Sequence, residues 1–197
     1  MHDSRHDRAQ TLIVIGASAG GSEAIRRILS ALPADLPAAL AIVLDTRPGV
    51  PPGLIEGWQA QCALAVSYAV NGQIASNGRV YVAPADQHLL VGSECQLLLD
   101  DGPRVRYSRP SVDRLFETAA QYFRNRTIGV ILTGGDGDGA AGMRAITAVS
   151  GIGVVQEPSD SKDPSMPLTT LRTDHPRYCV PLREMAGLLS DLAARLA

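Results

Sequence analysis

Ser18 has the sequence context of a catalytic nucleophile, because it joins the apolar stretch TLIVIG (residues 11–16) to the helix-like sequence SEAIRRILSAL. Gly16 and Gly20 flank it in a G-x-S-x-G pattern, which lifts a serine hydroxyl clear of the sheet at a tight strand-to-helix turn. The start of the helix, at Ala19 and Gly20, offers backbone N–H groups and a positive dipole end to a developing oxyanion.

Two aspartates follow two further apolar stretches. Asp45 ends the run AALAIVLD (38–45), and Asp138 follows the run TIGVILTG (127–134) within the glycine-rich sequence LTGGDGDGAAG. In an open parallel sheet, ligands bind beyond the carboxyl ends of the strands. The sequence therefore predicts that Ser18, Asp45 and Asp138 converge on one edge of a sheet.

Each of these residues also has a simpler interpretation. Ser18 could cap the helix of a phosphate-binding loop, although the dinucleotide pattern G-x-G-x-x-G is not met because Ser18 stands where its second glycine belongs. Asp138 alone is typical of a helix N-cap, and Asp45 alone of a strand-end or turn carboxylate. A calcium loop is not supported, because the segment from Asp136 to Gly139 lacks the third ligand position and the terminal glutamate.

The elements that must position these residues alternate between strand and helix. The continuous apolar runs are typical of buried parallel strands. The short runs VYVAP, HLLVG and QLLLD predict a small antiparallel β-hairpin insert at about residues 75–107. The pattern predicts an α/β fold with a doubly wound, mostly parallel sheet and helices on both faces. Residues 1–10 are predicted to be a disordered tail, and residues 11–197 a single domain.

Composition narrows the classes of function. A formal net charge of −2 and an aromatic content of 4% argue against nucleic-acid binding. The three cysteines, Cys62, Cys95 and Cys179, form no C-x-x-C pair, so we expect no disulfide framework and no zinc site. We also expect no other metal and no cofactor. No apolar run approaches the roughly 20 residues of a membrane span, and no secretory segment precedes the first strand. We therefore expect a cytoplasmic protein without direct membrane insertion.

Five sequence motifs together resemble the catalytic domain of bacterial chemotaxis protein-glutamate methylesterases, the CheB family. They occur in the family's order between about residues 11 and 195, and they are IGASAGGSEAIRRIL, GRVYVAPADQHLLV, RPSVDRLF, GVILTG…DGAAGM and SMP. The resemblance implies a hydrolase that removes γ-glutamyl methyl esters from the cytoplasmic helices of chemoreceptors, or from a related protein substrate. It also implies a Ser-His-Asp triad, in which Ser18 matches the nucleophile and Asp138 the aspartate, and it places Gly135 on the oxyanion side.

The sequence departs from this family at the triad histidine. The family has Q-H-M-P or L-H-L-P after the second strand, whereas this chain has Asp45 at the histidine's place, or Thr46 if the alignment slips by one residue. The family's methionine in T-G-M-G-x-D-G is replaced by Gly135. No phosphorylatable receiver domain precedes the domain, so we expect no gating by phosphorylation within this chain.

The missing histidine leaves three interpretations. The chain could be a serine hydrolase in which Asp45 accepts the Ser18 proton, a base weaker than histidine by roughly 2 to 3 pKa units. It could be a catalytically impaired pseudoenzyme that binds a receptor or another partner. Alternatively, Asp45 and Asp138 could activate a water molecule together, as paired carboxylates do.

The histidines and three arginines are further candidates for parts of the site. Among the histidines, His2 and His6 lie in the predicted tail, His88 is expected to be structural, and His175 a loop residue. Near the predicted insert, three arginines could orient the carboxylates of an acidic substrate, or could form a solvated hairpin face. They are Arg104, Arg106 and Arg109.

Overall fold

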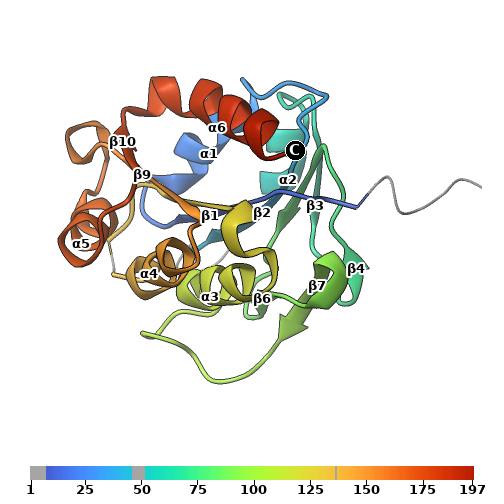
Figure 1. The fold of residues 1–197 in the computed structure, drawn as a ribbon, viewed down its shortest axis with the longest axis horizontal. Helices are drawn as coiled ribbons and strands as arrows, with labels where there is room; N and C mark the ends of the chain where they lie inside the picture. Colours follow the sequence, from blue (N-terminus) through green and yellow to red (C-terminus); the bar gives the residue numbers. More distant parts are fainter. Residues whose placement is uncertain (1–7, 46–51, 136) are drawn as a thin grey trace, which may run out of the picture.

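A seven-stranded parallel sheet forms the centre of the structure, with its strands in the order β10-β9-β8-β1-β2-β5-β3 (Figure 1). The structure, a computed structural model, describes residues 8–45, 52–135 and 137–197. The strands of this sheet are β1 (Leu12–Ala17), β2 (Ala39–Leu44), β3 (Ala65–Tyr68), β5 (Arg79–Val82), β8 (Thr127–Ile131), β9 (Ile152–Gln156) and β10 (Tyr178–Val180). Parallel strands need crossover connections, and helices supply most of them here.

Helices cover both faces of the sheet, as predicted for a doubly wound fold. In Figure 1, α1, α2 and α6 lie on one face and α3, α4 and α5 on the other. Their bounds are α1 (Gly21–Leu29), α2 (Leu54–Gln59), α3 (Val112–Phe123), α4 (Ala140–Ala148), α5 (Ser165–Thr173) and α6 (Leu182–Leu196). Short 3₁₀ turns are η1 (Ser93–Cys95), η2 (Arg124–Arg126) and η3 (Pro158–Asp160).

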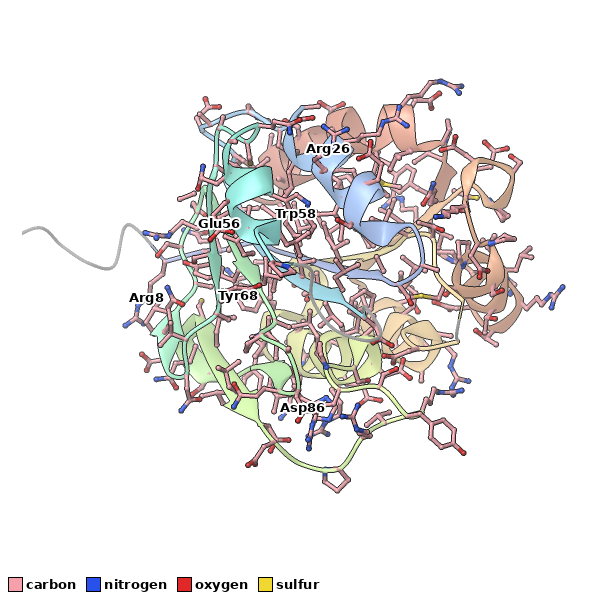
Figure 2. All side chains as sticks on the ribbon, turned by 180° about the vertical axis from the view of Figure 1, so that it is seen from behind. Arg8, Arg26, Glu56, Trp58, Tyr68 and Asp86 are labelled. Atoms are coloured by element: carbon pink, nitrogen blue, oxygen red, sulfur yellow. The ribbon has the colours of Figure 1, made fainter. Side chains whose placement is uncertain are left out.

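The apolar run of β1 explains why this strand occupies the middle of the sheet. Successive side chains of a strand point to opposite faces. Ile13 and Ile15 pack into the core beneath α1, α2 and α6, where Trp58 also lies (Figure 2), whereas Leu12 and Val14 pack into the core beneath α3. A strand buried on both faces must be apolar at every position, which is the pattern that the sequence shows.

A three-stranded antiparallel sheet, in the order β4-β7-β6, lies beside the main sheet. Its strands are β4 (Gln73–Ile74), β6 (His88–Val91) and β7 (Gln96–Asp100). The prediction of an antiparallel insert is confirmed, but the inclusion of VYVAP in it was wrong. That run forms β5, which pairs in parallel with β2 and β3. The reason is burial on both faces: Val80, Tyr81 and Val82 are at most 1% exposed.

The residues directly before β1 already pack against the rest of the structure. Residues 1–7 of the predicted tail lie outside the described residues. Ala9 is buried, and its N–H donates to the carbonyl oxygen of Ala75 at 2.9 Å. Over the described ranges, none of the helices has both the length and the apolar character that a membrane span requires.

Gly16, near the end of β1, lies against Val112 at the start of α3. A Cβ atom on Gly16 would lie 2.2 Å from Cγ1 of Val112, a distance that real side chains do not adopt. The absence of a side chain at this position therefore lets the first turn of α3 rest directly on the end of β1, beside the turn that carries Ser18.

We expect Gly16→Ala to lower the free energy of unfolding by about 1–3 kcal/mol, because it overpacks this contact. Combining it with Val112→Ala should cost less than the sum of the two single changes, because the valine methyl groups are the obstacle. Chemical denaturation of the four proteins measures this coupling.

Gly57→Ala is the matched control, because nothing lies within 4 Å of the added Cβ. It should be neutral or stabilising by up to about 1 kcal/mol, since alanine is the better helix former. Strict additivity of Gly16→Ala and Val112→Ala would contradict the steric explanation.

Candidate active site

Ser18 lies at the point where the strand order of the main sheet reverses. From β1 the chain proceeds outward through β2 in one direction, and it later returns to β8 on the other side of β1. In open α/β sheets, such a switch point forms a crevice at the carboxyl ends of the strands. Ser18 directly follows β1, and its N–H donates to the carbonyl oxygen of Thr133, beyond β8, at 3.0 Å. Ser18, the candidate nucleophile, therefore lies in this crevice between the ends of β1 and β8.

The turn after Ser18 presents the beginning of α1. The Ser18 carbonyl oxygen accepts the N–H of Gly21 at 2.8 Å, and Gly20 adopts a left-handed backbone with φ of 82°. Within the described residues, the N–H groups of Ala19, Gly20 and Gly135 donate to no acceptor. Ala19 and Gly20 directly follow Ser18 in the chain, and backbone N–H groups are the kind of donor that an oxyanion requires.

Asp45 lies opposite Ser18 across the β1–β2 pair. Ala17 pairs with Leu44, and the N–H of Asp45 extends the ladder by donating to the Ala17 carbonyl oxygen at 2.9 Å. The Ser108 hydroxyl donates to Oδ2 of Asp45 at 2.8 Å, and Ser108 is 1% exposed. The structure thus places the Asp45 carboxylate on the Ser18 edge and orients it through a buried hydroxyl.

Asp138 lies at the same edge, and it caps a helix other than the one that follows it. Its Oδ2 accepts the N–H of Val112 at 2.6 Å, and its Oδ1 accepts the N–H of Asp113 at 2.9 Å and the hydroxyl of Ser111 at 3.0 Å. These donors belong to the start of α3. The simpler interpretation of Asp138 as an N-cap is thus correct in kind, but the capped helix is α3 and not α4.

Asp113, at the start of α3, in turn caps the start of α4. Its Oδ1 accepts the N–H groups of Gly139 and Gly142 at 2.9 and 2.8 Å. Its Oδ2 lies 3.4 Å from Nε of Arg106. We call this exchange between Asp113 and Asp138 the reciprocal cap. It satisfies backbone donors at two helix starts with two buried carboxylates.

Burial controls the protonation of Asp138. Removal from water raises its pKa from 3.8 to about 6, and the negative charge of Asp113 acts in the same direction. Hydrogen bonds from the backbone of Asp113 and Val112 and from the Ser111 hydroxyl oppose the rise. The carboxylate is therefore a group whose charge changes in the mildly acidic range.

Neither of the described histidines is positioned to serve Ser18. His88 is buried, and its Nδ1 accepts the N–H of Ser111 at 3.2 Å, so Nε2 carries the proton that it donates to the Pro103 carbonyl oxygen at 3.0 Å. His175 is exposed and precedes β10, which places it at the amino edge of a parallel sheet, opposite Ser18. His2, His6 and Thr46 lie outside the described residues.

Two segments of the site were missed by sequence reasoning. Ser108, Ser111 and Asp113 orient the two aspartates, and Ser111 and Asp113 belong to the motif RPSVDRLF. The segment before α5 also reaches the site, because the N–H of Gly134 donates to the Asp163 carbonyl oxygen at 3.0 Å. A serine followed two residues later by an aspartate is a helix-start signal. This signal indicates where α3 begins, but not which loop will contact the start of the helix.

The three arginines near the insert already hold carboxylates of the chain. Nη2 of Arg104 and Nη2 of Arg109 lie 2.6 and 2.9 Å from the carboxylate oxygens of Asp86. Asp86 lies in the turn between β5 and β6 (Figure 2). Arg109 also donates to the carbonyl oxygen of Gly102 at 2.9 Å. Arg106 contacts Asp113, as described above. These side chains therefore brace the loop that carries Ser108 to Asp45.

Within the described ranges, no group of three or more histidine, cysteine, aspartate or glutamate side chains is arranged to hold a metal ion. The chemistry that the site itself offers is that of a hydroxyl, two carboxylates and backbone donors.

Comparison with known proteins identifies the family. The family model described as CheB methylesterase matches residues 13–189. The chain belongs to this CheB methylesterase family. It is also similar to the crystal structure of the Thermotoga maritima CheB methylesterase catalytic domain, with a TM-score of 0.86 and 28% identity over 92% of this chain and 98% of that one.

Curated CheB relatives differ in how much of their length this chain spans. A Leptospira interrogans relative is 35% identical over 91% of this chain and 93% of its own length. The Vibrio vulnificus protein-glutamate methylesterase/protein-glutamine glutaminase 2 is 37% identical over 92% of this chain, which spans 53% of that relative. The corresponding Yersinia pestis protein is 44% identical over 68% of this chain and 39% of its own length.

The raised pKa of Asp138 predicts how the stability of this CheB domain depends on pH. Because the folded-state pKa of about 6 exceeds the ordinary value of 3.8, the folded state binds the proton more tightly than the unfolded state. The contribution of this proton to the free energy of unfolding is up to about 3 kcal/mol. It is fully present below about pH 4 and is lost as the pH rises through about 6.

Asp138→Asn removes the titration. We expect the free energy of unfolding of the original protein to fall relative to that of this variant as the pH rises from about 4 to about 6. Urea unfolding followed by circular dichroism measures both values. Asp35→Asn, at an exposed aspartate, is the matched charge control. A difference that stays constant over this range would contradict the assignment.

Proposed function

We propose that this protein is a hydrolase of the protein-glutamate methylesterase type that uses Ser18 as its nucleophile. Its substrate would be the γ-glutamyl methyl esters of chemoreceptor cytoplasmic helices, so that it would act in the cytoplasm. The observation that carries the proposal is the position of Ser18: a tight strand-to-helix turn at the switch point of the sheet, beside the N–H groups of Ala19 and Gly20.

The geometry supports an acyl-transfer sequence. The Ser18 Oγ would attack the ester carbonyl carbon, and the N–H groups at the start of α1 would stabilise the oxyanion, with Gly135 offering a further donor. Methanol would leave, and water would then release the free carboxylate. Asp45, one position beyond the β1–β2 ladder, is the group that we propose to accept the Ser18 proton.

Turnover should be slow, because an aspartate starts about 2 to 3 pKa units below histidine and is the weaker base. Asp138 has its oxygens directed at the start of α3, and Asp45 accepts the hydroxyl of Ser108. The two carboxylates thus bind different donors. This arrangement supports the serine route better than activation of one shared water molecule.

A second candidate function is a receptor- or partner-binding module without turnover. It is favoured by one observation: among the described residues, neither histidine lies at the Ser18 edge. Removal of a triad histidine costs up to about 10⁶-fold in turnover in other serine hydrolases. A fold that retains the crevice but has lost the base would still bind a substrate helix.

Arg104 and Arg106 are the exposed members of the proposed docking set, with side chains 52% and 57% exposed, whereas that of Arg109 is 20% exposed. A guanidinium has five donors, so an arginine that is already paired can still bind a substrate carboxylate. We propose that these arginines orient acidic substrate residues, with Arg109 acting partly through the loop it braces.

Methanol release from a methylated receptor fragment tests the function. In the original protein we expect slow release, which Ser18→Ala should lower by at least about 10³-fold, because the nucleophile is removed. Ser30→Ala, at an exposed serine that ends α1, is the matched control and should leave the rate unchanged. Equal rates in the original protein and Ser18→Ala would rule out Ser18 as the nucleophile.

Asp45→His separates the two candidate functions. Restoring an imidazole beside Ser18 should raise methanol release by about 10²- to 10⁴-fold, because a general base matched to neutral pH becomes available. A silent original protein that gains activity on this substitution would identify a binding module. Silence in every variant would point to a binding role or to a different substrate.

The docking arginines are tested by steady-state kinetics on the same fragment. Arg104→Gln and Arg106→Gln should raise KM with little change in kcat, because they remove binding made equally in the ground and transition states. Unchanged kinetics in both variants would show that these arginines only brace the loop.

A further inference from the structure

The turn that begins at Ser18 holds its central peptide in one defined orientation. The Ser18 carbonyl oxygen accepts the N–H of Gly21 at 2.8 Å, which closes a four-residue β-turn around Ala19 and Gly20. Gly20 has φ of 82° and ψ of −6°, whereas the φ of Ala19 is not positive. These angles define a type II turn. A type I turn would join the same ends with the Ala19–Gly20 peptide turned over.

The direction of the Gly20 N–H follows from that of the Ala19 carbonyl, because the two groups belong to one peptide unit. Among the described residues, the only cis peptide bond joins Arg109 to Pro110, so this unit is trans. The C=O and N–H of a trans peptide point in opposite directions. Whatever holds the Ala19 carbonyl oxygen therefore also aims the Gly20 N–H, which is one of the oxyanion donors of the proposed function.

The Thr133 hydroxyl holds the Ala19 carbonyl. It donates to the Ala19 carbonyl oxygen at 2.8 Å. The other acceptor within reach, the Asp163 carbonyl oxygen, is farther away at 3.2 Å and already accepts the N–H of Gly134. The same hydroxyl accepts the N–H of Asp163 at 2.9 Å. Thr133 is 2% exposed, so these hydrogen bonds are shielded from water.

Buried contacts fix the backbone of Thr133 as well. Its N–H donates to Oε1 of Gln156 at 2.9 Å, and its carbonyl oxygen accepts the Ser18 N–H at 3.0 Å. Gln156 is 1% exposed, and its Nε2 donates to the Asp160 carbonyl oxygen at 2.9 Å. Every polar group of Thr133 is thus bonded, and two of them, the hydroxyl and the carbonyl, contact the Ser18 turn.

The Gly135 N–H is aimed in the same way. It shares a trans peptide with the Gly134 carbonyl, which accepts the N–H of Met166 at 2.9 Å. A Cβ atom built on Gly134 would lie 3.0 Å from Cβ of Ser18 and would collide with Sδ of Met166. This peptide is held by a backbone donor, whereas the Ala19–Gly20 peptide is held by the side chain of Thr133. Substitution of Thr133 can therefore test the principle.

We propose that Thr133 is a positioning residue, which keeps the Ser18 turn in its type II form and so directs the Gly20 N–H to an oxyanion formed at Ser18. The inference rests on the proposed function for the identity of the ester, but any tetrahedral adduct of Ser18 presents the same oxygen. Without the hydroxyl, the Ala19 carbonyl loses its donor, and the peptide is free to turn over and carry the Gly20 N–H away. The loss falls on the transition state, because the oxyanion forms only there.

Phenylboronic acid tests this role without ester hydrolysis. Its boron bonds to a serine Oγ and the hydroxyl proton passes to solvent, which leaves a tetrahedral boronate with one oxygen in the oxyanion position. By boron NMR, we expect the original protein to bind it and Ser18→Ala to lose this binding. Thr133→Val, which removes the hydroxyl at similar volume, should weaken binding by about 10- to 100-fold, somewhat less than the loss of a whole oxyanion donor. Thr133→Ser should restore it.

Thr127→Val is the matched control, because it makes the same substitution at a buried threonine of β8. The Thr127 hydroxyl donates to the Ala119 carbonyl oxygen at 3.1 Å, at the amino end of the strand and away from Ser18. This variant should bind phenylboronic acid as the original protein does. An equal loss in Thr127→Val and Thr133→Val would show a general effect on folding and would overturn the positioning role.

The original protein alone provides a second measurement, which does not depend on the folding of any variant. The Gly20 amide proton gains an acceptor in the boronate adduct, so its proton NMR signal should move downfield when phenylboronic acid binds. A Gly20 signal that does not move, or an original protein without binding that depends on Ser18, would overturn the inference.

Methanol release separates this role from the hydrolase function. Where the methylated receptor fragment is hydrolysed, Thr133→Val should lower kcat with little change in KM, because the donor acts only in the transition state. Unchanged affinity of Thr133→Val for phenylboronic acid would overturn the positioning role even if methanol is released. Weaker binding that Thr133→Ser restores would support it even if no variant releases methanol, and the hydrolase function would then fail alone.

Discussion

The reciprocal cap between Asp113 and Asp138 is the interaction on which the geometry of the candidate site depends. A buried carboxylate is costly unless donors surround it, and the free N–H groups at a helix start supply such donors. Because each aspartate lies just before or within the first turn of one helix and binds the start of the other, the loop after β8 and the start of α3 are joined. The loop that precedes α3 carries Ser108 to Asp45, so the same exchange also positions the second aspartate.

This arrangement holds Asp45 and Asp138 at the Ser18 edge through contacts that do not involve the Ser18 side chain. Asp138 caps the start of α3, so it has a structural reason to be present that is independent of catalysis. Asp45 keeps a buried hydroxyl as its donor. The crevice, the serine turn and the backbone donors of α1 depend on strand order and glycine positions rather than on the base. A change of the residue that accepts the proton would therefore leave this geometry in place.

Much of the fold could be predicted because its signals are local. The apolar runs of β1, β2 and β8 reflect burial on both faces, and α3 begins at Val112 because Ser111 serves as its N-cap. The prediction for VYVAP failed because an apolar run of four or five residues fits a hairpin or an interior strand equally well. Its pairing with β2 and β3 depends on the path of the whole chain. The N-cap interpretation of Asp138 was correct in kind for a similar reason: the residue type indicates capping, but only packing decides which helix is nearby.

By itself, the sequence determined the strand-turn-helix that exposes Ser18, the family, and the convergence of Ser18 and Asp138 on the carboxyl edge of a parallel sheet. These depend on residue types at fixed spacing along the chain. The tertiary structure alone decided that Ser108 orients Asp45, that His175 lies at the opposite edge, and that the Thr133 hydroxyl holds the Ala19 carbonyl. Each of these contacts joins residues more than sixty positions apart or depends on strand order, and strand order is set by which faces pack together rather than by any local pattern.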